Sequence, residues 1–391
     1  MHPTPQAIAV VTLLTGALNT ILMKMQFSVV SLGSESCATT STTGHATSTL
    51  LCAFNKPWFG VLQVKLGMTL CLVYLFARKK LLHRSFLETP VHAASMTMYD
   101  ALRAPETPTC TTLVATIIPA ALDLVQSVFS FIGLLWIPAS IYQMSGGSML
   151  IFSAFLSVKF LHVRLFTYHY VSIALVAFAL VCVSAASYAQ SPSMHSAADD
   201  GANMAIGLFF ILLSRFLYSV NIAIEEYFMT TLHVSPVLQA GMEGIWGLVL
   251  FVPLVPCLSY TAPGSSALST IWHEDFGDTW IKLRHSPSLV VLVVLYVLCV
   301  ATYNVAANWV TKHMSSIVRS MIENGRTLGV WLLGLGLYYV ANEPSMGESW
   351  TSWSWLELLG FGLLVYATLA YKQVVRYPCQ SVYRDGFIPI H

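Results

Sequence analysis

The feature that most constrains this chain is a series of roughly ten apolar segments, each about 20 residues long. A helix of that length crosses the hydrocarbon core of a bilayer, which is about 30 Å thick. The chain of 391 residues is 56% hydrophobic and only 9% charged, whereas soluble domains carry about 25% charged residues. A soluble globule of this size could not cover its surface with so few charges. The sequence therefore predicts an all-α integral membrane protein with ten transmembrane helices.

The predicted spans cover nearly the whole chain. The first apolar stretch, 7–30, follows residues without Lys or Arg and is long, so we interpret it as a retained span rather than a cleaved signal peptide. Pro138 indicates a tight turn between the third and fourth spans. We place the spans at residues 6–30, 57–77, 111–136, 138–161, 168–189, 203–227, 236–260, 286–309, 315–340 and 352–371.

Basic residues divide unevenly between the two sides of this arrangement. With the N-terminus in the cytoplasm, eleven Lys and Arg residues fall in cytoplasmic loops or the tail, and three (Lys56, Lys282 and Arg284) fall on the other side. Cytoplasmic loops carry an excess of Lys and Arg, so both termini are expected in the cytoplasm, which requires an even number of spans. Length alone leaves nine or eleven spans open. Residues 31–49 and 261–285 are expected to be loops on the non-cytoplasmic side.

Sequence motifs for catalysis are missing. The chain contains no P-loop GxxxxGK[ST], no HExxH metal motif and no GxSxG nucleophile elbow. Its eight Cys residues show no CxxC or Cys/His metal spacing, so we expect no metal and no cofactor. The net charge of +1 offers no excess charge for nucleic acid. The chain is therefore not expected to be an enzyme, and any transport must be facilitative or driven by a gradient.

Two of the cysteines, Cys37 and Cys52, share the first predicted non-cytoplasmic loop. In an oxidising lumen they could form a disulfide. The alternative is a pair of free thiols.

Ionisable residues inside the spans carry the functional signal, because a charge near the bilayer centre costs at least roughly 2.5–3.5 kcal/mol. In the ninth span, Arg319, Glu323 and Arg326 stand at i, i+4 and i+7 and therefore share one helix face. Two cations and one anion leave a positive charge for another helix or a ligand. One interpretation is an internal ion-pair ladder that holds the bundle together. The other is a face that contacts substrate or forms a gate.

Other spans contribute amides and carboxylates. Glu225 and Glu226 lie near the cytoplasmic end of the sixth span, where one of them could simply be solvated. Asp123 and Glu243 are candidates for carrying a proton. The amides expected to contact and orient a solute are Gln143, Asn221, Asn19, Asn304 and Asn308. For Asn19, Asn304 and Asn308, hydrogen bonding between helices explains their position equally well.

Several of these stretches resemble a known family. They are LTGALNT at 14–20, IEEYF at 224–228, GMEGIWG at 241–247, NVAANWVTK at 304–312 and SIVRSMIENGRT at 316–327. Together they resemble the drug/metabolite transporter superfamily, and within it solute carrier family 35, subfamily F. The resemblance implies ten helices in two inverted five-helix repeats around a central cavity, and an endomembrane setting such as a lysosome or the Golgi. Relatives often carry Arg where this chain has Gly146, so their substrates cannot be transferred to it.

We therefore predict a first repeat over 1–195, a second over 196–375 and a cytoplasmic tail, 376–391. The predicted function is secondary transport of a small polar or ionisable solute by alternating access. Arg319 and Arg326 would contact a carboxylate or phosphate, and Glu323 would hold them in register. Two alternatives stay open: a Golgi nucleotide-sugar exchanger of the same fold, and a non-transporting adaptor that recruits partners through 81–110 or the tail. Neither the solute nor the oligomeric state follows from the sequence.

Overall fold

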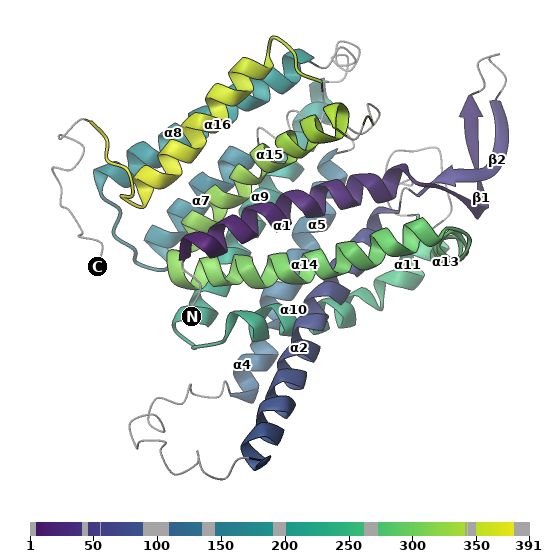
Figure 1. Ribbon diagram of the computed structural model, residues 1–391, viewed down its shortest axis with the longest axis horizontal. Helices are drawn as coiled ribbons and strands as arrows, with labels where there is room; N and C mark the ends of the chain where they lie inside the picture. The colour runs from purple at the N-terminus through teal and green to yellow at the C-terminus, as the bar shows by residue number, and fades with distance from the viewer. Residues whose placement is uncertain are drawn as a thin grey trace.

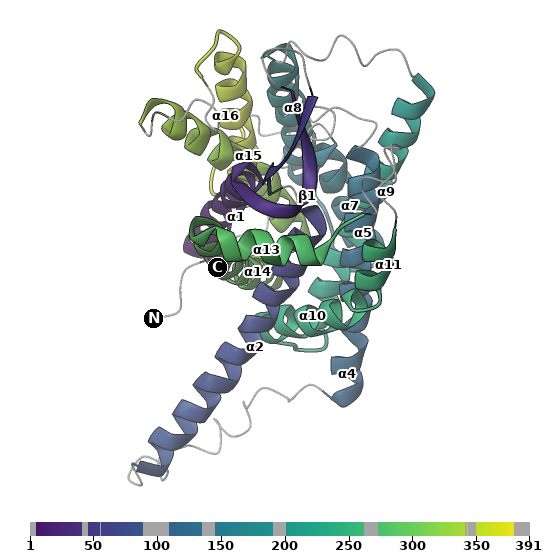
Figure 2. The same cartoon turned by 90° about the vertical axis from the view of Figure 1, so that its right-hand side faces the viewer.

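A computed structural model of the chain describes residues 5–40, 46–54, 56–88, 109–134, 145–190, 201–261, 273–340, 342 and 349–378. These residues form a bundle of long helices with a projecting β-hairpin (Figure 1), and helix α2 extends out of the bundle (Figure 2). In chain order the elements are α1 (Pro5–Ser28), β1 (Val30–Thr40), β2 (Ala46–Ala53), α2 (Pro57–Glu88), α4 (Cys110–Ala115), α5 (Ile117–Leu134), α7 (Gly146–Lys159), α8 (Thr167–Gln190), α9 (Gly201–Thr230), α10 (Pro236–Phe251), α11 (Leu254–Tyr260), α13 (Phe276–His285), α14 (Pro287–Met314), α15 (Ser316–Tyr339) and α16 (Ser354–Tyr371).

Six helical segments of the described chain are long and apolar enough to cross a membrane, or seven if the bent pair α10 and α11 forms one span. The six are Gln6–Ser28, Pro57–Ala77, Cys110–Ser130, Ala205–Thr230, Pro287–Met314 and Ser354–Tyr371. Helix α7 is apolar but shorter, and α15 carries several charged residues in its first half. The multi-pass, mostly helical membrane architecture is thereby confirmed, whereas ten spans and the inverted repeat stay predictions.

Side chains are distributed as a lipid environment requires. Large apolar groups such as Phe209 and Val252 are 61% and 68% exposed, whereas Lys65 and Glu243 are 1% and 3% exposed. In water this arrangement would be unfavourable, because apolar surface would be wetted and charges buried. In a bilayer it is favourable, because charged groups avoid hydrocarbon by facing the interior of the bundle.

Prolines explain where the predicted spans are interrupted. The segment predicted as one span over 236–260 bends by 43° between α10 and α11, next to Pro253. Proline has no N–H to donate and its ring clashes with the carbonyl four residues earlier, so the helix breaks there. Likewise the third predicted span divides into α4 and α5 at Thr116, just before Pro119.

Two segments predicted to be loops are regular structure instead. Strands β1 and β2 pair antiparallel from Val30 opposite Ala53 to Thr40 opposite Ala46, with an irregularity after Leu32. The Thr-rich strands suit this conformation, because β-branched side chains favour extended backbone. The predicted loop 261–285 contains helix α13, whose first turn is capped by the Asp275 carboxylate accepting from the Gly277 amide at 2.8 Å.

The helices approach one another closely at glycines. Helix α10 packs on α2, α8 on α16, α5 on α9, and α1 on α14. At the crossing of α10 and α2, a Cβ placed on Gly244 would lie 2.4 Å from the backbone nitrogen of Thr69. Small residues at such crossings are typical of membrane helices, whose association depends on tight packing.

Replacing Gly244 with Ala is therefore expected to push α10 away from α2. We expect the Gly244→Ala variant to lose about 1–3 kcal/mol of stability, the usual effect of overpacking, measured as a lower melting temperature in detergent. Gly362→Ala is the matched control, because a Cβ there would meet no atom of another described helix within 4 Å. Equal melting temperatures for the two variants would contradict the close approach of α10 and α2.

Candidate substrate site

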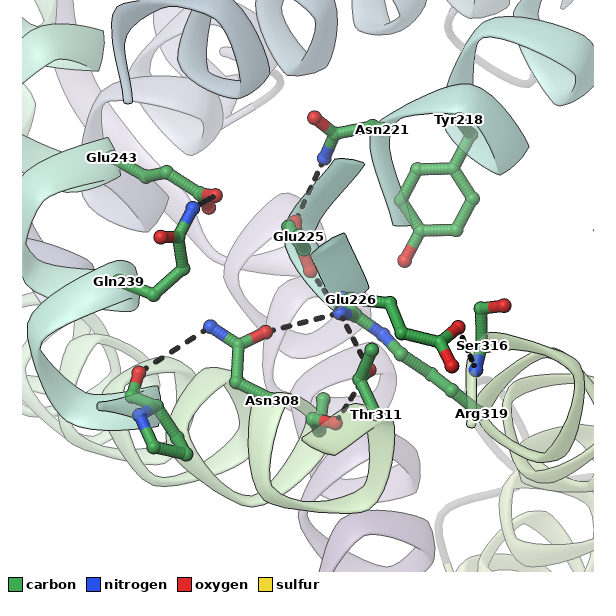
Figure 3. A network of polar contacts seen from close by, with 12 residues as sticks. Tyr218, Asn221, Glu225, Glu226, Gln239, Glu243, Asn308, Thr311, Ser316 and Arg319 are labelled. Atoms are coloured by element: carbon green, nitrogen blue, oxygen red, sulfur yellow. Dashed lines mark hydrogen bonds and ion pairs between the residues drawn. The ribbon is translucent and has the colours of Figure 1, made fainter. Parts of the chain in front are cut away.

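The centre of the bundle holds a buried network around Arg319 of α15 (Figure 3). The Arg319 side chain is 4% exposed and forms ion pairs with Glu225 of α9 and, through Nε at 2.9 Å, with Glu323 of α15. Its Nη1 also donates to Asn308 Oδ1 at 3.0 Å and to Thr311 Oγ1 at 3.3 Å, both on α14. One guanidinium thus joins three helices, as its fork of donors allows.

The two carboxylates that pair with Arg319 have further donors. Glu323 Oε1 accepts hydrogen bonds from Tyr218 OH at 2.9 Å and from Tyr303 OH at 3.1 Å. Glu225 Oε1 accepts from Asn221 Nδ2 at 2.8 Å. Buried carboxylates require such donors, since removing their charge from water is unfavourable unless it is compensated.

A second ion pair lies between α2 and α5. Lys65, which is 1% exposed, pairs with Asp123. Gln126 Nε2 donates to the other oxygen of Asp123 at 3.1 Å, and Ser214 of α9 donates to the Gln126 carbonyl at 2.8 Å. The polar interior therefore extends from α15 across α9 to α5 and α2.

Glu243 of α10 differs from Asp123, Glu225 and Glu323, each of which forms an ion pair with a Lys or Arg. It is 3% exposed and accepts a hydrogen bond from the neutral amide of Gln239, at 2.7 Å (Figure 3). The other amide atom, Gln239 Oε1, is buried and has no hydrogen-bond partner among the described residues. Glu243 therefore has a neutral hydrogen-bond partner, whereas the carboxylates that pair with Lys65 or Arg319 have a cationic one.

The turn between α14 and α15 is fixed by polar contacts. Glu226, 6% exposed, accepts from the Ser316 amide at 2.8 Å, so a carboxylate sits at the N-terminus of α15, where the helix dipole favours negative charge. Lys372 Nζ donates to the Met314 carbonyl at 2.9 Å. Burial lowers the pKa of Lys372 from its ordinary value, and Glu226 opposes that effect. The alternative in which one of Glu225 and Glu226 is solvated does not hold, because both side chains are buried.

The structure brings together some of the predicted site residues and leaves others apart. The Arg319 network includes Glu323, Asn308 and Asn221. Asn304 instead donates to the Val300 carbonyl of its own helix at 2.9 Å, and Gln143 lies outside the described residues. Asn19 is 9% exposed, and its Oδ1 has no hydrogen-bond partner in the described part of the chain.

Arg326 packs against the first helix. A Cβ placed on Gly16 of α1 would lie 2.9 Å from Arg326 Cδ and 3.0 Å from a ring carbon of Tyr303. The absence of a side chain at Gly16 therefore makes room for the arginine stem. The structure places Arg326 beside α1 and Tyr303 of α14, and Tyr303 also donates to Glu323 of the Arg319 network.

Several members of the polar interior were not identified from the sequence, among them Tyr218, Thr311 and Ser153. Tyr218 and Thr311 contact the network directly, and Ser153 of α7 hydrogen-bonds Ser320 of α15 at 2.7 Å. Helical spacing could have revealed the first two. Tyr218 precedes Asn221 by three residues and Thr311 follows Asn308 by three, so each continues a polar stripe.

The predicted cysteine pair lies in the hairpin. Cys52 is disulfide-bonded, and the side chain of Cys37 lies outside those that the structure describes. The pairing of Cys37 with Cys52 stays a prediction.

Comparisons with known proteins connect this architecture to transporters. A model of the nucleotide-sugar transporter family matches residues 66–229. An uncharacterized protein of Schizosaccharomyces pombe is 29% identical over 261 residues, covering 67% of this chain and 74% of that protein. Human solute carrier family 35 member F6 is 26% identical over 261 residues, which cover 66% of each chain. The match thus spans just under two thirds of the human relative.

A solved crystal structure extends the likeness to the fold. It aligns with a TM-score of 0.53 over 95% of this chain and 96% of that chain, at 10% sequence identity. At this identity only the fold is shared. The family match, the relatives and the apolar helices show a multi-pass membrane protein that is similar to transporters of solute carrier family 35, subfamily F, and these likenesses indicate a transporter rather than an enzyme.

Proposed function

We propose that the protein is a secondary transporter that moves a small polar solute with an ionisable group by alternating access. The observation that carries this proposal is the buried Glu225–Arg319–Glu323 network, which links α9, α14 and α15 in the middle of the bundle. Ionisable groups inside a membrane protein typically line solute or proton pathways. In this proposal α1 to α8 form one five-helix repeat and α9 to α16 the other, counting α4 with α5 and α10 with α11 as single spans and leaving out the short α13.

The solute would bind Arg319 by displacing one of the carboxylates that now pair with it. The structure pairs this guanidinium with two carboxylates, so a carboxylate or phosphate of a solute would replace one of them. Arg326, which packs beside α1, would be the second cation, and the amides Asn221 and Asn308 would orient the solute. Breaking one ion pair while forming another keeps the buried charge compensated throughout.

For proton coupling we propose Glu243 in preference to Asp123. Asp123 forms an ion pair with Lys65, and protonating it would leave a buried lysine without its partner. Glu243 is bonded to a neutral amide, so it can gain a proton without breaking an ion pair. The two candidates therefore differ in what their protonation would disrupt.

Glu243→Gln tests this assignment, because the amide keeps the shape of the carboxylate but cannot carry a proton. We expect uptake into proteoliposomes to fall to the rate seen without a proton gradient, with the melting temperature unchanged. Asp123→Asn is the matched comparison and is expected to lower the melting temperature. Full gradient dependence in Glu243→Gln would exclude Glu243 as the coupling group.

Uptake by the purified protein tests the proposed function itself. Pooled labelled amino acids, short peptides, organic cations and nucleotide sugars would be offered with and without an inward proton gradient. Uptake of one pool, lost in Glu323→Gln with its fold retained, would support a site at the Arg319 network. If the protein is folded and inserted but takes up none of the pools, the transport proposal is contradicted and a membrane adaptor is favoured. Deleting 81–110 or the tail would then test the adaptor.

A nucleotide-sugar exchanger is the second candidate, because the family matched over residues 66–229 is described as nucleotide-sugar transporters. An exchanger would take up a nucleotide sugar faster when the vesicles are preloaded with a nucleoside monophosphate. Uptake that depends on the proton gradient and not on preloading would favour the first proposal.

The proposal also includes an endomembrane location with both termini in the cytoplasm. Protease protection of terminal tags in isolated organelles would test this orientation.

A further inference from the structure

An apolar cavity of about 620 Å³ lies on the side of the bundle, between α1, α2, α10 and α14. None of its lining residues belongs to the Arg319 network, and its walls are almost wholly apolar. Two of its lining residues, Tyr74 and Leu298, are 60% and 53% exposed, so the cavity is open outward as a groove. The lining residues are Ala7, Ile8 and Val11 of α1, Leu70, Cys71 and Tyr74 of α2, Val237 of α10, and Leu298, Ala301, Thr302, Val305, Ala306 and Trp309 of α14.

The position and length of the groove match one leaflet of a bilayer. Three of its four walls, α1, α2 and α14, belong to segments long and apolar enough to span the membrane, so the medium outside is hydrocarbon. Along α14 it runs from Leu298 to Trp309, which corresponds to about 16 Å at the rise of a helix. Half of a hydrocarbon core of about 30 Å has nearly this thickness.

One end of the groove is aromatic and basic. Trp309 stacks on His313 with ring centroids 4.6 Å apart, and Lys312 lies between them in the sequence. On the opposite wall, the sequence of α2 continues after Tyr74 with Arg78, Lys79 and Lys80. Both walls therefore pass from apolar lining to basic residues at the same end. Tryptophan marks the headgroup level of a membrane, and juxtamembrane basic clusters bind anionic headgroups.

We propose that this groove binds an anionic phospholipid, with one acyl chain between α2 and α14 and the phosphate headgroup at the basic end. The apolar walls suit the chain, and the basic residues of α2 and α14 suit the negative headgroup. By the positive-inside rule the lipid would belong to the cytoplasmic leaflet. This site is separate from the proposed transport site, and its test measures lipid binding without any transported solute.

The experiment is native mass spectrometry of the full chain, delipidated in detergent and titrated with dioleoyl phosphatidylserine or dioleoyl phosphatidylcholine. The two lipids share acyl chains and differ in headgroup charge. We expect one retained phosphatidylserine per chain, bound about fivefold tighter than phosphatidylcholine for each basic residue that contacts the headgroup.

Thr302→Trp should fill the exposed side of the groove and abolish retention. Val294→Trp is the control, because Val294 lies on the same helix, is 52% exposed and does not line the groove. Unchanged retention in Thr302→Trp would overturn the site. His313→Glu changes the basic end at an exposed position, and is expected to reduce binding of phosphatidylserine but not of phosphatidylcholine. Equal wild-type affinity for the two lipids would overturn headgroup recognition.

Discussion

Replacing Arg319 with Met is expected to lower the free energy of unfolding by about 3–5 kcal/mol and to abolish uptake. The side chain is 4% exposed and compensates Glu225 and Glu323, which are themselves buried. Methionine has a similar length and no charge, so Arg319→Met would leave two carboxylates without a cation in a medium that solvates them poorly. Thermal denaturation in detergent and uptake into proteoliposomes would measure the two effects.

A triple variant separates the structural role of Arg319 from its role in transport. Combining Arg319→Met with Glu225→Gln and Glu323→Gln removes the whole buried charge set, and such replacements are often neutral for stability. We expect the triple variant to regain most of the melting temperature and none of the uptake. Wild-type uptake in the triple variant would mean that Arg319 only holds the bundle together. Wild-type stability in the single variant would contradict the buried network.

Replacing Asp278 with Ala is expected to detach the β-hairpin from helix α13, with a local loss of about 3–5 kcal/mol. The Asp278 side chain is fully buried and pairs at 3.0 Å with both Lys56 and Lys282, which are 7% and 4% exposed. Its other oxygen accepts from the Ser34 amide at 2.7 Å. Without the carboxylate, two buried ammonium groups would repel each other and the strand would lose its acceptor.

Hydrogen–deuterium exchange is the appropriate measurement, because the effect should be confined to β1 and α13. The Ser34 amide and its neighbours are expected to exchange faster in Asp278→Ala, while amides of α15 keep their protection. Asp275→Ala is the matched control. It removes a carboxylate three residues earlier that only caps α13, and caps contribute about 0.5–2 kcal/mol. Equal exchange of the Ser34 amide in both variants would show that the Asp278 ion pairs do not fasten the hairpin.

The sequence predicted much of the helical organisation, because hydropathy depends on composition and length alone. The stripe Arg319, Glu323 and Arg326 follows from helical spacing, and the i, i+4 contact of Arg319 with Glu323 is present in the structure. Pairing within one helix needs no tertiary information. The β-hairpin was missed because its Ser- and Thr-rich strands lack the alternation of apolar and polar residues that signals a half-buried sheet.

Sequence alone determined that this chain belongs in a membrane and where its charged stripe lies. The first follows from the length and hydropathy of its apolar segments, and the second from the spacing of residues along one helix. Only the tertiary structure decided what that stripe does. It pairs Arg319 with Glu225, 94 residues away, and places Arg326 beside Gly16 on another helix. The partner of a buried charge depends on which helices pack together, and that packing results from close contacts such as the one at Gly244 rather than from the hydropathy of any single span.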